Sequence, residues 1–190
     1  MISVMGFDPS MRNWGIARGF YDPLTYDLKI VEGLVVQPDK STDKVKSVRK
    51  NSQDLEHASN LVLEVHQYLN RWQPQALFVE VPVGSQNARA MCGYGMCIGI
   101  LAWLYKAKYP FYLVTPTEVK IALGGTKTAS KETMIDIAVK THPEMNWPMY
   151  KDSVVKSSAE HIADAIGAIH AGIQKQDFIN LIAITNKRHQ

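Results

Sequence analysis

The first third of the chain alternates short apolar runs with turn-forming residues, a pattern typical of β-strands. Strands are predicted at residues 2–8, 14–20 and 27–36, and Pro23 favours a turn between the second and the third. Because short connections join these strands, we expect them to form an antiparallel meander.

After residue 50 the spacing of apolar residues changes to steps of three and four, which indicates a helix that continues to about residue 72. Pro74 then stops the helix. The predicted apolar stripe consists of Leu55, Ala58, Val62, Val65, Leu69 and Trp72. The continuous apolar run at 76–82 predicts a central strand that is buried on both faces and parallel to the first strand.

The second half of the chain is predicted to be mostly helical. The helix at 85–107 is apolar on most sides, so we expect it to be buried within the domain or against a partner chain. The other expected elements are a strand at 111–115, helices at 117–123, 131–141 and 158–173, an irregular loop at 142–156, and a C-terminal tail at 175–190 that contains a short apolar segment at 178–184.

A meander followed by parallel strands with crossover helices predicts an α/β fold. We expect a five-stranded mixed sheet with helices on both faces. A length of 190 residues indicates a single domain over 1–190.

Charge and cysteine content narrow the function classes only slightly. A net charge of +3 permits a nucleic-acid partner without arguing for one. The lysine-rich segment 37–50, with Lys40, Lys44 and Lys46, fits either a solvated charge run or a phosphate-contacting loop. Cys92 and Cys97 do not match a zinc site and are expected to be reduced core thiols, which suits the cytoplasm.

No secretory signal or membrane span is expected from the sequence. The N-terminus lacks a basic region ahead of its apolar run, and Asp8 interrupts that run. The longest apolar stretch, residues 96–105, is short for a membrane span.

Acidic residues end two of the predicted central strands. Asp8 follows the first strand and Glu80 follows the strand at 76–80, while the segment from Glu160 to Asp164 lies beside the apolar face of the last predicted helix. Considered alone, each of these acidic residues could simply be a turn residue or a solvent-exposed charge without a functional role. Gathered at one edge of the sheet, they would repel one another unless a cation such as Mg²⁺ bound there. Two such ions are suited to phosphodiester hydrolysis.

Four segments make the chain resemble the RuvC-type Holliday junction resolvases of the RNase H-like superfamily, as a bacteriophage-type or bacterial member. The segments are Gly6–Arg12, Phe78–Glu80, Thr115–Lys131 and Glu160–Ala168, and together the resemblance covers nearly the whole chain. Three positions depart from the family pattern: Ser10 replaces a usual glycine, Val83 a frequent aromatic residue, and Glu160 is an additional acid.

The resemblance implies a set of functional residues and partners. Asp8, Glu80, His161 and Asp164 would bind two Mg²⁺ ions, for which Mn²⁺ can substitute, and Glu160 is a further candidate ligand. Lys120 and Lys131 would contact phosphate near the cut strand. The implied protein is a homodimeric endonuclease for four-way or other branched DNA, with helix 85–107 as the candidate interface.

Three alternatives remain open from the sequence. The chain could be an RNase H-like nuclease that acts on RNA–DNA hybrids, flaps or forks. It could be a catalytically silent DNA-binding module of the same fold, although such a module has no need to hold carboxylates together. An actin-like nucleotide-binding fold shares the strand order but normally needs two such domains, and this chain has the length of one.

Overall fold

A five-stranded mixed sheet forms the centre of the computed structural model, which describes residues 1–38, 49–84, 86–107, 109–151 and 153–187. Its strands are β1 (Ile2–Asp8), β2 (Trp14–Tyr21), β3 (Leu28–Val36), β4 (Ala76–Glu80) and β5 (Phe111–Val114), and they lie in the order β3-β2-β1-β4-β5. β1, β2 and β3 pair antiparallel, whereas β1–β4 and β4–β5 pair parallel. The predicted meander and the predicted parallel central strand are both confirmed.

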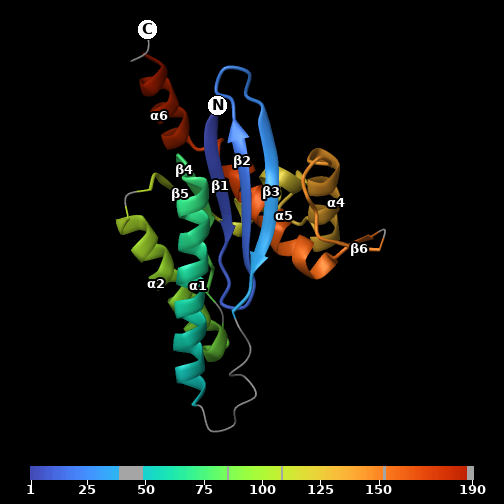
Figure 1. Cartoon of the computed structure of the whole chain (residues 1–190). Coiled ribbons are helices and arrows are strands. Elements are labelled where there is room, and N and C mark those ends of the chain that lie inside the picture. Colours follow the sequence, from blue (N-terminus) through green and yellow to red (C-terminus); the bar gives the residue numbers. More distant parts are fainter. Residues whose placement is uncertain (39–48, 85, 108, 152, 188–190) are drawn as a thin grey trace.

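Helices cover both faces of this sheet (Figure 1). On one face lie α1 (Lys50–Trp72) and α2 (Ala88–Lys106). The other face is covered by α5 (Lys156–Gly172), with α3 (Pro116–Gly124) and α4 (Lys131–Thr141) packed against it. The side chains of β1 alternate accordingly: Val4 joins the core on the α5 face, while Met5 and Phe7 join the core on the α1 face.

Helix α5 lies directly on the sheet because glycine occupies the strand positions beneath it. A Cβ atom at Gly6 of β1 would stand 2.0 Å from the carbonyl oxygen of Ala165, and one at Gly15 of β2 would stand 2.2 Å from the carbonyl oxygen of His161. Both distances are far inside van der Waals contact. The lack of a side chain at these two positions therefore sets how closely α5 approaches the ends of β1 and β2.

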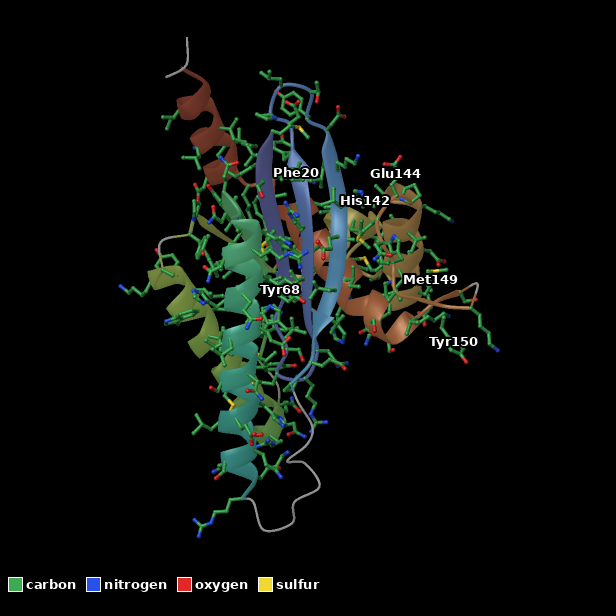
Figure 2. All side chains as sticks on the ribbon, in the orientation of Figure 1. Phe20, Tyr68, His142, Glu144, Met149 and Tyr150 are labelled. Atoms are coloured by element: carbon green, nitrogen blue, oxygen red, sulfur yellow. The ribbon has the colours of Figure 1, made fainter. Side chains whose placement is uncertain are left out.

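The C-terminal segment, expected as a tail, forms a helix, α6 (Gln176–Lys187). Phe178 anchors it in the core, where its ring packs against those of Tyr21, Phe78 and Tyr112. The segment 142–156, expected as an irregular loop, contains a small hairpin of β6 (Met149–Tyr150) and β7 (Ser153–Val154). Figure 2 shows Met149 and Tyr150 on this hairpin, where both are exposed.

Two expectations about buried residues are wrong. Leu55 is 72% exposed, and the buried side of α1 instead begins with Gln53, Asp54 and His57 before it continues through Leu61 and Val65. Leu55 lies in the second turn of α1, where the buried side is formed by the polar residues Asp54 and His57, and the spacing of apolar residues alone could not show this. Cys97 is buried as expected, but Cys92 is exposed on α2 and is not a core thiol. Lys40, Lys44 and Lys46 lie outside the described residues.

Helix α2 buries only one side, formed by Cys97, Ile100, Leu101 and Leu104. Among the described residues it is the one helix that is long and apolar enough to cross a membrane, judged by length and composition alone. Its buried side packs in the core against the sheet and α1, which is how a helix of a globular domain behaves. Its opposite side carries exposed large apolar residues.

The close approach of α5 is testable by adding a single methyl group. Gly6→Ala should destabilise the protein by about 1–3 kcal/mol, because the new Cβ would overlap the backbone of α5. Denaturant unfolding followed by circular dichroism measures this change. Gly95→Ala on α2 is the matched control, because nothing lies within 4 Å of its Cβ and alanine favours a helix. Equal stability of the two variants would contradict the packing described here.

Candidate active site

Asp8 and Glu80 are the last residues of two neighbouring parallel strands. The register of β1 and β4 pairs Phe7 with Val79, so the next residue of each strand, Asp8 and Glu80, emerges at the same edge of the sheet. Gly6 helps to fix the position of β1, because a slip by one residue would bring a larger side chain against the backbone of α5.

His161 and Asp164 reach the same edge from α5. They are three residues apart and therefore share one side of the helix. The contact between Gly15 and the His161 backbone places this turn of α5 directly above the end of β2, beside Asp8. The structure thus brings together Asp8, Glu80, His161 and Asp164, which belong to three separate elements.

Asp8 and His161 form the most direct contact in the site. Asp8 Oδ2 lies 2.7 Å from His161 Nδ1, and the two side chains are only 17% and 19% exposed. This hydrogen bond, helped by the negative charges of Asp8, Glu160 and Asp164, raises the pKa of His161 despite the opposing effect of burial. Imidazole protonation is therefore favoured by the surrounding acids.

The other two carboxyl groups are strongly perturbed. Burial, and then the negative charges of Asp8 and Asp164, raise the pKa of Glu80 to about 8. Burial, followed by the charges of Asp8 and Glu160, raises the pKa of Asp164 to about 7. Each acid thus resists ionisation because the other acids are close by and little water reaches it.

Two lysines complete the charge distribution. Lys131, the first residue of α4, forms an ion pair with Glu160, and this contact raises the lysine pKa. Lys120 on α3 is close enough for its charge to lower the pKa of Glu80 against the effect of burial. Each of the seven residues singled out in the sequence therefore interacts electrostatically with at least one other member of the group.

Carboxylate oxygens in this number are the ligands that Mg²⁺ prefers, and the raised pKa values of Glu80 and Asp164 show that the nearby lysines and His161 only partly compensate the negative charge. Within the described ranges, however, no three His, Cys, Asp or Glu side chains stand so that they could hold a metal ion together. One oxygen of Asp8 faces His161 and one oxygen of Glu160 faces Lys131. The residues fit a divalent cation by donor chemistry and charge. The contacts of Asp8 with His161 and of Glu160 with Lys131, however, occupy carboxylate oxygens that such a cation would need.

Sequence analysis identified the charged members of the site but missed Gly6 and Gly15, which allow α5 to bring its residues to Asp8. The signal that was available is the occurrence of glycine inside a predicted strand, which often marks a close approach of another backbone.

Comparisons with known proteins agree with this arrangement. No family model matches the chain. Two relatives named crossover junction endodeoxyribonuclease RuvC are similar in sequence. The protein of Pseudarthrobacter chlorophenolicus is 25% identical over 73% of this chain, and that of Cutibacterium acnes is 31% identical over 67% of it. The matched segments span 67% and 60% of those relatives, respectively.

Solved structures show the same fold. Thermus thermophilus RuvC in complex with a Holliday junction substrate superposes with a TM-score of 0.65 and 21% identity, covering 90% of this chain and 92% of that one. The yeast mitochondrial Holliday junction resolvase superposes with a TM-score of 0.64 and 13% identity, covering 98% and 84%.

The sheet order and the acidic edge therefore define a protein with the RNase H-like fold. Within that class, the sequence relatives that the chain is similar to carry the name RuvC, and solved RuvC structures share its fold.

The crowding of acids predicts an unusual pH dependence of stability in metal-free protein. Because the folded-state pKa of Glu80 lies near 8, above its ordinary value of 4.5, the folded protein keeps a proton that the unfolded chain loses, and stability falls as pH rises from about 4.5 to 8. With EDTA present, Glu80→Gln should raise the melting temperature at pH 8.5 by roughly 2–8 °C, and the gain should shrink towards pH 5.

Glu56→Gln, which changes an exposed carboxyl on α1, is the control and should alter the melting temperature little at either pH. A Glu80→Gln effect that is the same at pH 5 and pH 8.5 would show that Glu80 is not held close to other acids.

Proposed function

We propose that this protein is a metal-dependent endodeoxyribonuclease that resolves four-way and other branched DNA junctions by phosphodiester hydrolysis. The convergence of Asp8, Glu80 and Asp164 at one sheet edge is the observation that carries this proposal, and burial together with the neighbouring acids raises the pKa values of Glu80 and Asp164 there. The names of the sequence relatives, crossover junction endodeoxyribonucleases, support the reaction and the substrate class.

Asp8, Glu80, His161 and Asp164 are the residues that would hold two Mg²⁺ ions, with Mn²⁺ able to substitute and Glu160 as a further ligand. Bound there, the ions would supply an activated water and stabilise the leaving oxygen. The protein contributes carboxyl groups that are already gathered, so that little reorganisation of the backbone is needed. Burial and the neighbouring acids raise the pKa values of Glu80 and Asp164, and a positive charge held between these carboxyl groups would favour their ionised forms.

The two lysines would contact the phosphate, whereas the histidine orients Asp8. The Lys131 side chain is 72% exposed and, although paired with Glu160, can reach a phosphate oxygen beside the acids. Lys120 stands close enough to Glu80 to stabilise negative charge that develops on the phosphate. His161 keeps Asp8 oriented through the hydrogen bond from its ring and is poised to hold a proton there.

A homodimer would supply the two cuts that resolution of a four-way junction requires. The outward side of α2 exposes Met91, Ile98, Trp103 and Tyr105, and the Trp103 ring packs against His66 of α1. Exposed apolar side chains of this size on α2 are suited to an isologous contact with a second copy. We propose that α2 forms this interface and that the protein acts in the cytoplasm of a bacterial cell or of a phage-infected host.

The catalytic proposal predicts that Asp8→Asn abolishes junction cutting, with a loss of at least about 100-fold in rate, because one negative charge and its oxygen ligand geometry are removed. The measurement is gel analysis of a labelled four-way junction in Mg²⁺, with a linear duplex of the same length and an EDTA sample beside it. Asp136→Asn, an exposed residue of α4, should cut like the parent protein.

Full cutting by Asp8→Asn, or activity that is indifferent to EDTA, would overturn the assignment of the site. Faster cutting of RNA–DNA hybrids or flaps than of the four-way junction would keep the site and transfer the proposal to that substrate.

The dimer proposal predicts that Ile98→Glu dissociates the protein into monomers, because it places a charge within an apolar contact. Sedimentation velocity at micromolar concentration measures this. Leu24→Glu, in the exposed turn between β2 and β3, introduces the same charge away from α2 and should leave the dimer intact. A parent protein that sediments as a monomer would remove the interface from the proposal.

A further inference from the structure

A small hairpin lies directly before α5, the helix that brings His161 and Asp164 to the candidate site. Its strands are β6 and β7, and Val155 alone separates β7 from the first residue of α5 (Figure 1). The Val155 backbone N–H donates to the carbonyl oxygen of Pro148 at 2.8 Å, which closes the base of the hairpin. The position of the hairpin is therefore tied to that of α5.

The base of the hairpin is fixed in the core, whereas its outer residues are not. Trp147 is buried, and its indole N–H donates to the carbonyl oxygen of His142 at 3.0 Å. Val154 packs against the same core. By contrast, Met149 is 55% exposed and Tyr150 is 69% exposed, and Figure 2 shows both on the side of the domain away from α1. A rigid base that holds large side chains out in water is suited to contact with a partner.

Lys151 follows Tyr150 in a backbone conformation that lysine rarely adopts. Its φ is 53°, in the left-handed region, where a Cβ atom is disfavoured and glycine is the usual residue. Its ammonium nitrogen lies 5.5 Å from the centre of the Tyr150 ring, within range of a cation–π interaction. The backbone would favour glycine here, so the ammonium group is what lysine contributes at this position.

The charges near the hairpin favour a negatively charged partner. Among the described residues of the hairpin and the first turn of α5, the charged side chains are those of Lys151 and Lys156, and both are exposed. Asp152 lies outside the described residues. The first turn of α5 contains no acidic residue, and Glu160, one turn further on, is paired with Lys131. A phosphate that approaches the hairpin therefore meets lysines before it reaches the acids of the site.

The hairpin is close enough to contact DNA that is bound at the catalytic edge. Helix α5 begins at Lys156, and with a rise of about 1.5 Å per residue His161 lies roughly 8 Å along it. The chain from Tyr150 to Lys156 spans at most about 22 Å. Tyr150 is therefore at most about 30 Å from the site, which corresponds to roughly nine nucleotides of a B-form strand.

We propose that the β6–β7 hairpin contacts the phosphate backbone of one duplex arm of the junction, with Lys151 as the residue that binds phosphate and Tyr150 as the ring that orients its ammonium group. The proposal rests on the nuclease function proposed above and adds a DNA contact outside the catalytic edge. Contacts to phosphate carry no sequence information, so this one positions the arm without selecting a base. Lys156 extends the same positive surface towards the cut.

Lys151→Gly is the decisive variant, because it removes the charge and suits the positive φ of this position. It should bind a four-way junction about 3- to 10-fold more weakly than the parent at 0.1 M salt, and the slope of log Kd against log salt concentration should fall by about 1. Fluorescence anisotropy in EDTA measures both quantities without cutting. Tyr150→Ser should weaken binding by a smaller factor, because the ammonium group loses the ring that orients it.

Two substitutions at the opposite end of the sheet are matched controls. Tyr26→Gly replaces an exposed aromatic residue at a positive φ in the turn between β2 and β3. Arg71→Gln removes one exposed positive charge from the last turn of α1. Both β2 and α1 end beside the start of β1, whereas Asp8 stands at the other end of that strand. Both controls should keep the affinity and the salt slope of the parent.

Neutral methylphosphonate groups locate the contact when they replace single phosphates within about nine nucleotides of the cut. One such replacement should weaken binding of the parent by the same factor as Lys151→Gly. It should have little further effect on the Lys151→Gly variant, because both changes remove the same ionic contact. Two junctions of different base sequence should give the same result.

The outcomes separate the two proposals. A parent protein that neither cuts nor binds the junction would refute the nuclease function itself. Lys151→Gly with the affinity and salt slope of the parent, or a loss of affinity that no single phosphate accounts for, would overturn the hairpin contact alone.

Discussion

Mutual repulsion among buried carboxyl groups is the constraint on which the rest of this structure depends. Asp8, Glu80 and Asp164 stand at one edge of the sheet with little water between them, and the pKa values of Glu80 and Asp164 are raised as a result. Keeping acids in this arrangement costs stability at neutral pH. The fold accepts this cost at the edge of the sheet, between two apolar cores, and strongly perturbed acids of this kind mark a candidate functional site.

The backbone makes this arrangement possible. Parallel pairing of β1 and β4 delivers two of the acids, and the third comes from a helix that touches the strands because Gly6 and Gly15 carry no side chains. The Asp8–His161 hydrogen bond then joins the sheet to the helix. In the absence of a cation, His161 and Lys131 partly balance the negative charge, each through contact with a different acid.

Much of the fold was predictable because its strands and helices differ clearly in the period of their apolar residues. The strands that end in Asp8 and Glu80 and the helix that carries Asp164 were all found in this way. The spacing of apolar residues did not predict features that depend on tertiary packing. Leu55 is exposed although it is apolar. Helix α6 is held in place by Phe178, which contacts residues from three strands. The Asp54–Arg89 pair joins residues 35 positions apart, and no local pattern predicts such a contact.

The central claim is that these acids are gathered in order to bind divalent cations, and direct measurement of Mn²⁺ binding by electron paramagnetic resonance tests it without any DNA. The parent protein should remove free Mn²⁺ from solution at neutral pH, and the double variant Glu80→Gln with Asp164→Asn should remove far less. Mn²⁺ binding that is equal in the two proteins, or absent from both, would contradict the account.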